Sequence, residues 1–152
     1  MDVVALARSK VTAKIIDALY VEAMVLADDA RAYFDTFSRE ERDALGPVLR
    51  VAFSCESLKV TTRLMHIIAW LLGQRAHFAP ATSPNVAQPG RLGGPTETDI
   101  ALLAELPEGA RTRIEASLDL YARVARLDAD MGSQDLPKSP ARALMDQLSR
   151  AF

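Results

Sequence analysis

The 152-residue chain has few of the residues on which most catalytic and metal sites are built. It has one cysteine, Cys55, and two histidines, His66 and His77. A single cysteine excludes an internal disulfide framework and any zinc site with several cysteine ligands. The two histidines lie eleven residues apart on one expected helix, about 16 Å along its axis, so they cannot share a metal ion within it. We therefore expect no metal and no cofactor, and we infer that the protein is not an enzyme.

Neither the charge nor the apolar runs of the chain point to a nucleic acid or a membrane. Eighteen basic and twenty acidic residues leave a net charge of −2, without the basic excess that nucleic-acid binding requires. The most apolar stretch, Leu64–Leu72, contains His66 and is much shorter than the roughly 20 residues of a membrane span. No signal peptide is visible at the N-terminus. We expect a cytoplasmic protein with no membrane span.

The composition favours helices. Twenty-five alanines and nineteen leucines are strong helix formers, and 40 residues of Leu, Ile, Val and Phe are enough for one core. Apolar residues recur at helical spacing over residues 10–37. Ser38 and Glu41 fit a capping box that opens a short helical turn. The Gly-Pro pair at 46–47 then begins a second long helix, predicted to end near Phe78.

The second half of the chain begins with a break. Residues 79–96 contain seven proline and glycine residues and are predicted to form a long loop. A short helix over 96–105 and a third long helix over 106–131, ended by Gly132, follow. The prediction is an all-α fold, a three-helix bundle with two long helices and a long Pro/Gly loop before the third. Its domain spans residues 1–131.

Residues 132–152 are predicted to be a flexible or short-helical C-terminal tail. Ser139 and Pro140 fit a helix cap and the first helical residue. A helix of about twelve residues is marginal alone in water, so it must pack on the domain or on a partner. The apolar residues expected to dock this tail are Leu144, Met145, Leu148 and Phe152.

The helix from Pro47 carries more apolar surface than one neighbouring helix can cover. One row consists of Val51, Cys55, Leu58, Met65 and Leu72. The other row consists of Phe53, Val60, Leu64, Ile67 and Leu71. The helix should therefore lie between at least two partners, from its own chain or from another copy. The residues expected in the core or at a dimer interface are Phe53, Leu58, Leu64, Ile67 and Leu71. Spacing leaves open which row faces a second subunit, and it predicts that the Cys55 thiol is buried and inert.

A third line along the same helix is polar, and we call it the polar seam. Its members are Glu56, Lys59, Arg63, His66 and Trp70. One interpretation is a solvated face whose i,i+3 and i,i+4 ion pairs contribute about 0.2–0.5 kcal/mol each. The other is a recognition strip, because Arg and Trp are frequent anchor residues in interfaces. We keep the polar seam as the candidate partner-binding surface and leave both interpretations open.

Three runs of the sequence resemble an alphaproteobacterial family. The longest, VLRVAFSCESLKVTTRLMHIIAWLL at residues 48–72, resembles the core of the RcdA family, the regulators of CtrA degradation. EAMVLADDARAYF at 22–34 and LYARVARLD at 120–128 support the resemblance. It covers residues 20–78 closely and residues 106–131 more loosely.

The resemblance implies a three-helix bundle that forms a homodimer and performs no chemistry. A member of this family acts as an adaptor for the ClpXP protease once the response regulator CpdR has primed it. It recruits substrates and works with PopA, a cyclic-di-GMP effector, to deliver the cell-cycle regulator CtrA. Recruitment to a cell pole together with these partners is a further expectation.

Two other classes of function stay open. A structural homodimeric scaffold would have the same fold and dimer but no effect on proteolysis. A small-molecule-binding helical bundle would need a ligand cavity, and its ligand would raise the melting temperature.

Overall fold

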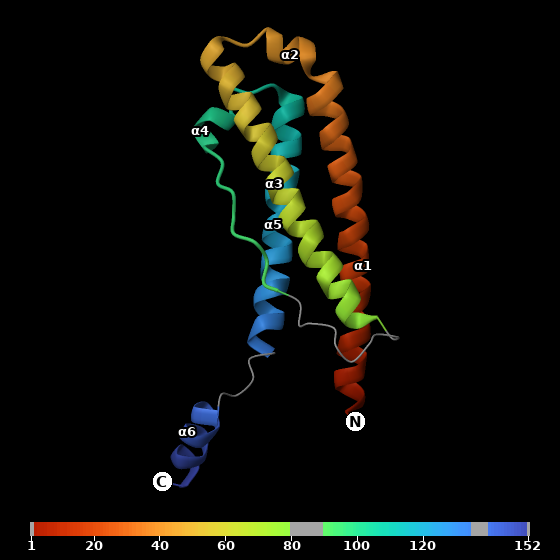
Figure 1. Ribbon diagram of the computed structural model, residues 1–152, viewed down its shortest axis with the longest axis vertical. Coiled ribbons are helices and arrows are strands. Elements are labelled where there is room, and N and C mark those ends of the chain that lie inside the picture. The colour runs from red at the N-terminus through yellow and green to blue at the C-terminus, as the bar shows by residue number, and fades with distance from the viewer. Residues whose placement is uncertain (1, 80–89, 135–139, 152) are drawn as a thin grey trace.

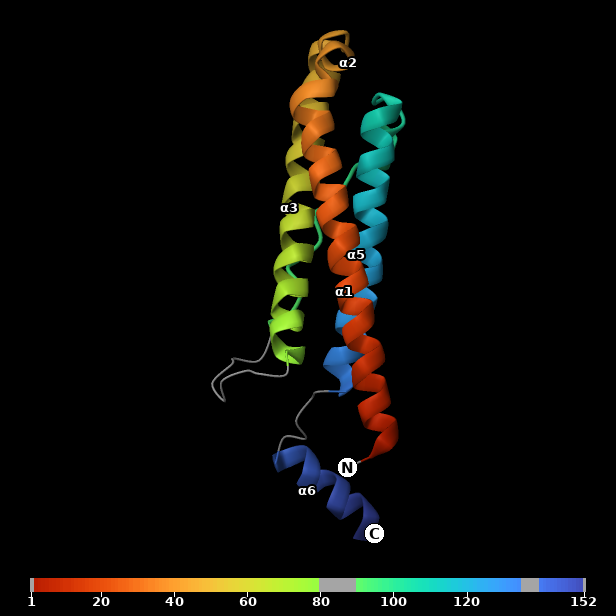
Figure 2. The same cartoon turned by 90° about the vertical axis from the view of Figure 1, so that its right-hand side faces the viewer.

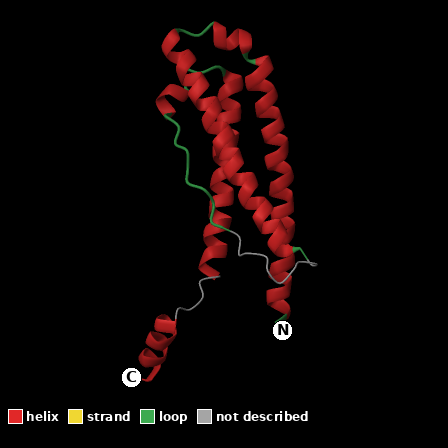
Figure 3. Cartoon of the chain, viewed as in Figure 1, coloured by secondary structure: helices red, strands yellow, loops and turns green. Residues whose placement is uncertain are grey.

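The computed structural model describes residues 2–79, 90–134 and 140–151. These residues form helices and connecting loops, with no strand among them (Figure 3). Three long helices, α1 (Val3–Ala32), α3 (Pro47–Phe78) and α5 (Glu108–Gln134), run side by side in both views (Figures 1 and 2). The predicted all-α helical bundle is confirmed.

Helix α1 begins at Val3, seven residues before the expected start at residue 10. The side chain of Asp2 caps it by accepting a hydrogen bond of 3.1 Å from the N–H of Val4. The apolar spacing missed this first part because its side chains are exposed and have no buried face to repeat. Local capping chemistry therefore sets the start of the helix.

A π-helical turn, η1 (Tyr33–Phe37), follows α1 and leads into α2 (Arg39–Asp43). The adjacent residues Tyr33 and Phe34 are both buried in it. The Phe34 ring packs edge-on against Phe53 of α3, with the ring centroids 5.5 Å apart. The hydroxyl of Tyr33 donates to Glu41 over 2.6 Å. Burial, followed by this hydrogen bond, raises the pKa of Tyr33 above its ordinary value.

The predicted capping box at Ser38 is wrong. The Ser38 side chain makes no cap hydrogen bond to α2. Its hydroxyl is buried and donates to the backbone carbonyl of Phe34 over 3.0 Å instead. Glu41 is likewise engaged by Tyr33. The π-helical turn carries the chain directly into α2, so no free N-terminus remains for Ser38 to cap.

Helix α3 has the predicted bounds, with Pro47 in its first turn. The predicted helix over 96–105 is reduced to α4 (Ile100–Leu103), which the side chain of Asp99 caps. Gly132 lies inside α5 and does not end it, contrary to the prediction. The part of the predicted loop that falls on residues 80–89 lies outside the described residues, and residues 90–99 have no regular secondary structure.

Helix α6 (Pro140–Ala151) occupies the tail, beyond the lower ends of α1 and α5 (Figures 1 and 2). Its expected docking residues Leu144, Met145 and Leu148 are exposed. Phe152 and the predicted cap Ser139 lie outside the described residues. Docking by this face stays a prediction.

One apolar row of α3 forms the centre of the core. All five of its members are buried: Phe53, Val60, Leu64, Ile67 and Leu71. They pack with α1 residues such as Ile16, Leu19 and Ala23, and with α5 residues such as Ile114, Leu120 and Val124. Helix α3 contacts both α1 and α5, which places it between two partners as predicted.

Truncating a residue of the buried row should destabilise the bundle. We expect Ile67→Ala to lower the free energy of unfolding by about 2–5 kcal/mol, because a fully buried side chain leaves a cavity. Ile100→Ala is the matched control, since Ile100 is exposed on α4, and it should change stability by less than about 0.5 kcal/mol. Urea unfolding followed by circular dichroism measures both; equal losses would contradict the assignment of the core.

Candidate functional site

The polar seam of α3 faces the 90–99 segment and α5. Glu56, Arg63 and Trp70 are buried, while Lys59 and His66 are half-buried. The 90–99 segment runs along α3 and α5 in an extended path toward α4 (Figure 1). Both interpretations of the sequence assumed an exposed row, and the structure corrects that point.

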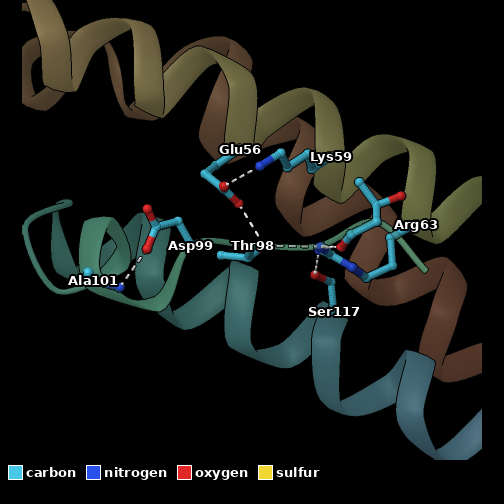
Figure 4. A network of polar contacts seen from close by, with 8 residues as sticks. Glu56, Lys59, Arg63, Thr98, Asp99, Ala101 and Ser117 are labelled. Atoms are coloured by element: carbon cyan, nitrogen blue, oxygen red, sulfur yellow. Dashed lines mark hydrogen bonds and ion pairs between the residues drawn. The ribbon is translucent and has the colours of Figure 1, made fainter.

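Arg63 lies at the centre of the polar seam and is 1% exposed. Its guanidinium donates to the Ser117 hydroxyl of α5 over 2.7 Å and to the Thr96 carbonyl over 2.6 Å. A third bond, of 3.2 Å, reaches the Thr98 hydroxyl (Figure 4). One cation therefore joins α3, α5 and the 90–99 segment through uncharged oxygens.

The charge of Glu56 acts on Arg63 through a bridging residue. Its carboxylate accepts one hydrogen bond from Lys59 over 3.0 Å and another from the Thr98 hydroxyl over 2.9 Å (Figure 4). Burial lowers the pKa of Arg63, and the charge of Glu56 acts in the opposite direction. The Thr98 hydroxyl therefore bridges the two buried groups, because it accepts a hydrogen bond from Arg63 and donates one to Glu56.

Asp128 of α5 forms a second centre of polar contacts, nearer the lower end of the bundle. The Trp70 indole donates to its carboxylate over 3.0 Å. The Leu92 backbone N–H and the Arg91 side chain donate to the other carboxylate oxygen, over 3.2 and 3.1 Å. Asp128 thus links α3 and α5 to the start of the 90–99 segment.

Two glycine carbonyls of the segment lie between these centres. The Tyr121 hydroxyl donates to the Gly93 carbonyl over 2.6 Å. The Nδ1 of His66 lies 3.2 Å from the Gly94 carbonyl, a contact in which the ring nitrogen is the donor. Burial, followed by the charge of Asp128, raises the pKa of Tyr121, so its hydroxyl stays protonated and able to donate.

Sequence reasoning missed the residues that face the polar seam from outside α3. They are Thr96, Thr98, Ser117, Tyr121 and Asp128. Asp128 offered one signal, because it lies four residues after the buried Val124 and so on the buried side of α5. The buried members of the polar seam, Glu56, Arg63 and Trp70, are not accessible to a partner while the 90–99 segment is in place. Direct partner binding by the polar seam stays a prediction.

The second apolar row of α3 points away from the core. Its members are all exposed, Leu58 to 68% and Met65 to 64%. Cys55 is exposed as well, which contradicts the expectation of a buried thiol. Of the expected core or dimer residues, Phe53, Leu64, Ile67 and Leu71 are in the core and Leu58 is not.

This outward face of α3 carries no charge over six helical turns. We call it the uncharged stripe, and all of its members are exposed: Val51, Ser54, Cys55, Leu58, Thr61, Thr62, Met65, Ala69 and Leu72. It is about 32 Å long at 1.5 Å per residue. A solvated helix face normally carries charged side chains, so a stripe of this length is typical of an interaction surface.

A groove between α1 and α3 borders the uncharged stripe. It has a volume of about 350 Å³ and is lined mainly by apolar atoms. Ala27 and Phe34 of α1 and η1 line one side, and Val60, Met65 and Ile68 of α3 line the other. Arg31 and Asp35 also line it. The groove therefore extends the exposed surface next to the uncharged stripe from α3 onto α1 and η1.

Metal sites and membrane spans are absent from the described residues. Among the described residues, no group of three or more His, Cys, Asp or Glu side chains could hold a metal ion. Within the same part of the chain, no helix is both long enough and apolar enough to cross a bilayer. The candidate functional features are therefore the polar seam with its segment and the uncharged stripe.

The chain is similar to a known protein family and to a solved structure. Residues 7–152 match a family described as a protein of unknown function, DUF1465. The fold is similar to the crystal structure of RcdA from Caulobacter crescentus CB15, with a TM-score of 0.56 and 30% sequence identity. The match covers 76% of this chain and 89% of that chain. No curated protein matches the sequence.

The buried position of Arg63 changes what a charge reversal should do. On an exposed polar row a charge reversal would leave the fold intact, but in the structure Arg63→Glu would place a carboxylate near Glu56 and remove three hydrogen bonds. We expect a loss of more than about 3 kcal/mol in the free energy of unfolding. Arg39→Glu, at an exposed position on α2, should change it by less than about 0.5 kcal/mol.

Urea unfolding of the two variants measures this difference. Arg63→Met adds a milder test, because it removes the charge and leaves the Thr96 carbonyl and Ser117 hydroxyl without their donor. It should cost about 1–3 kcal/mol. Wild-type stability in Arg63→Glu would show that the guanidinium does not hold the segment.

Proposed function

The chain belongs to the DUF1465 family of RcdA-like proteins, and we propose that it is a non-enzymatic protein-interaction adaptor that works as a homodimer. The RcdA resemblance suggests the partners. They are the ClpXP protease primed by a CpdR-like response regulator, a PopA-like effector, and substrates such as CtrA. The proposed site of action is the cytoplasm, with recruitment to a cell pole by these partners.

The uncharged stripe is the observation that carries this proposal. A catalytic protein needs a pocket with converging polar groups, whereas this stripe is an exposed helix face without charged side chains. Ser, Thr and Ala alternate with Leu and Met along it. Small residues allow two helices to approach closely, and large apolar ones supply the buried area.

A second copy of the chain is the proposed occupant of the stripe. In a two-fold dimer the same patch of each copy contacts the other, so its charged residues must not face like charges across the interface. A stripe with no charged residue meets that requirement, because no like charges are brought together. The polar seam lies on a different side of α3, so the dimer would leave the 90–99 segment that covers it accessible to other partners.

A charge in the stripe should weaken the dimer without unfolding the bundle. We expect Leu58→Asp and Met65→Asp to raise the dimer dissociation constant at least about tenfold, because each would bury an unpaired carboxylate. Light scattering after size exclusion gives the mass, and circular dichroism reports the fold. Ile100→Asp is the matched control on an exposed residue outside the stripe.

A buried-row variant completes this comparison. Leu64→Asp should unfold the bundle, because Leu64 is buried in the core. A wild-type protein that is monomeric at all concentrations, or a Leu58→Asp protein that dimerises as well as wild type, would contradict the proposed interface.

Reconstituted proteolysis tests the adaptor role. We expect the protein to accelerate degradation of a CtrA-like substrate by ClpXP in the presence of a CpdR-like regulator, and to leave the substrate intact when ClpXP is omitted. A PopA-like effector is included in a parallel arm. Unchanged turnover in every arm, with a dimer confirmed by light scattering, would favour the scaffold instead.

A further inference from the structure

The main chain of the 90–99 segment is held by side chains of α3 and α5. The four groups that hold it are Arg63, His66, Tyr121 and Asp128. The main-chain groups that they contact are the Leu92 N–H and the carbonyls of Gly93, Gly94 and Thr96. Contacts to the main chain are open to any extended segment, whatever its side chains.

Three positions of the segment add selectivity. The Arg91 side chain donates to Asp128, and the Thr98 hydroxyl bridges Glu56 and Arg63. At Gly93 an added Cβ would lie 2.7 Å from the His66 ring, so only glycine fits there. Its backbone does not have a positive φ, so close approach and not conformation requires the glycine.

We propose that the surface of α3 and α5 beneath the 90–99 segment is a binding site for an extended segment of a partner protein, and that the chain's own 90–99 segment occupies it as a built-in competitor. The partner segment has a basic residue, a glycine two positions later, and a Ser or Thr five positions after the glycine. This inference deepens the proposed function and rests on it for the class of partner, since an adaptor must hold the protein that it delivers.

The buried charge of Arg63 explains why this site on α3 and α5 needs an occupant. Without the segment, the guanidinium would lose the Thr96 carbonyl and the Thr98 hydroxyl and keep only Ser117. Unsatisfied polar groups in a buried position are costly. Any chain that supplies a carbonyl and a hydroxyl at the same spacing can replace these contacts.

The 90–99 segment would normally occupy the site because it is part of the same chain. A segment joined to the same chain has a high effective concentration, so a free peptide of equal intrinsic affinity competes poorly. Few apolar contacts add to its hold, because Leu92 is the residue of the described 90–99 segment that packs against the core cluster. A partner that also contacts the protein elsewhere would raise the effective concentration of its own segment at the site, which a short free peptide cannot do.

A labelled peptide with the sequence Arg-Leu-Gly-Gly-Pro-Thr-Glu-Thr, that of residues 91–98, tests the proposal on the full chain. Gly93→Ala should loosen the chain's own 90–99 segment, because the added Cβ would collide with the His66 ring. Gly90→Ala is the matched control, because a Cβ at this position meets no atom within 4 Å. We expect the peptide to bind Gly93→Ala at least tenfold more tightly than wild type or Gly90→Ala in fluorescence anisotropy. The same peptide with Ala at its third position should not bind.

A second variant is needed because the segment of Gly93→Ala can stay in place and block the site. In it, residues 91–98 are replaced by a Gly/Ser sequence of equal length, and circular dichroism confirms the helices. Absence of binding to both folded variants overturns the proposal, and so does equal binding of the Ala-substituted peptide. Dimers that form by exchange of the segment between copies would also overturn it, because the occupant would then be a second copy. The assay contains no protease, so its outcome is independent of the degradation test.

Discussion

The buried guanidinium of Arg63 is the constraint on which the arrangement around α3 depends. A charged group that is 1% exposed must have its donors satisfied, and here uncharged oxygens of α5 and the 90–99 segment do so. Each hydrogen bond to such a charge contributes about 1.5–3 kcal/mol, set against the cost of burying it. This requirement explains why a segment rich in glycine and proline follows a defined path along two helices.

The helices were predictable because their amphipathic spacing is an intrinsic property of the sequence. Pro47 could be placed at the start of α3 since its missing N–H is harmless there. The start of α1 was missed because an exposed first part has no apolar repeat, and two other errors lie at ends where contacts within the fold override local signals. Gly132 continues α5, and the Ser38 hydroxyl bonds back to Phe34 instead of capping α2. Those partners depend on packing, which spacing alone does not reveal.

The candidate site shows a different limit of sequence reasoning. Helical spacing correctly separated two apolar rows and one polar row on α3, but it could not say which of them meets solvent. The polar seam is covered by a segment about thirty residues later in the chain, while the apolar row with Leu58 and Met65 is exposed. Polarity predicts exposure only when nothing folds over the helix, and a loop without periodicity gives no signal of where it lies.

The four sides of α3 have different contacts. One side packs on α1, the buried row fills the core, the polar seam holds the 90–99 segment, and the uncharged stripe stays uncovered. The two candidate interaction surfaces have opposite chemistry, since one carries no charge while the other consists of hydrogen-bonding groups on α3 and α5. Apolar contacts suit a permanent partner, such as a second copy, and a site that is already filled suits a partner that must compete for entry. A single long helix can therefore combine stable assembly with exchangeable binding, because the two surfaces face different directions.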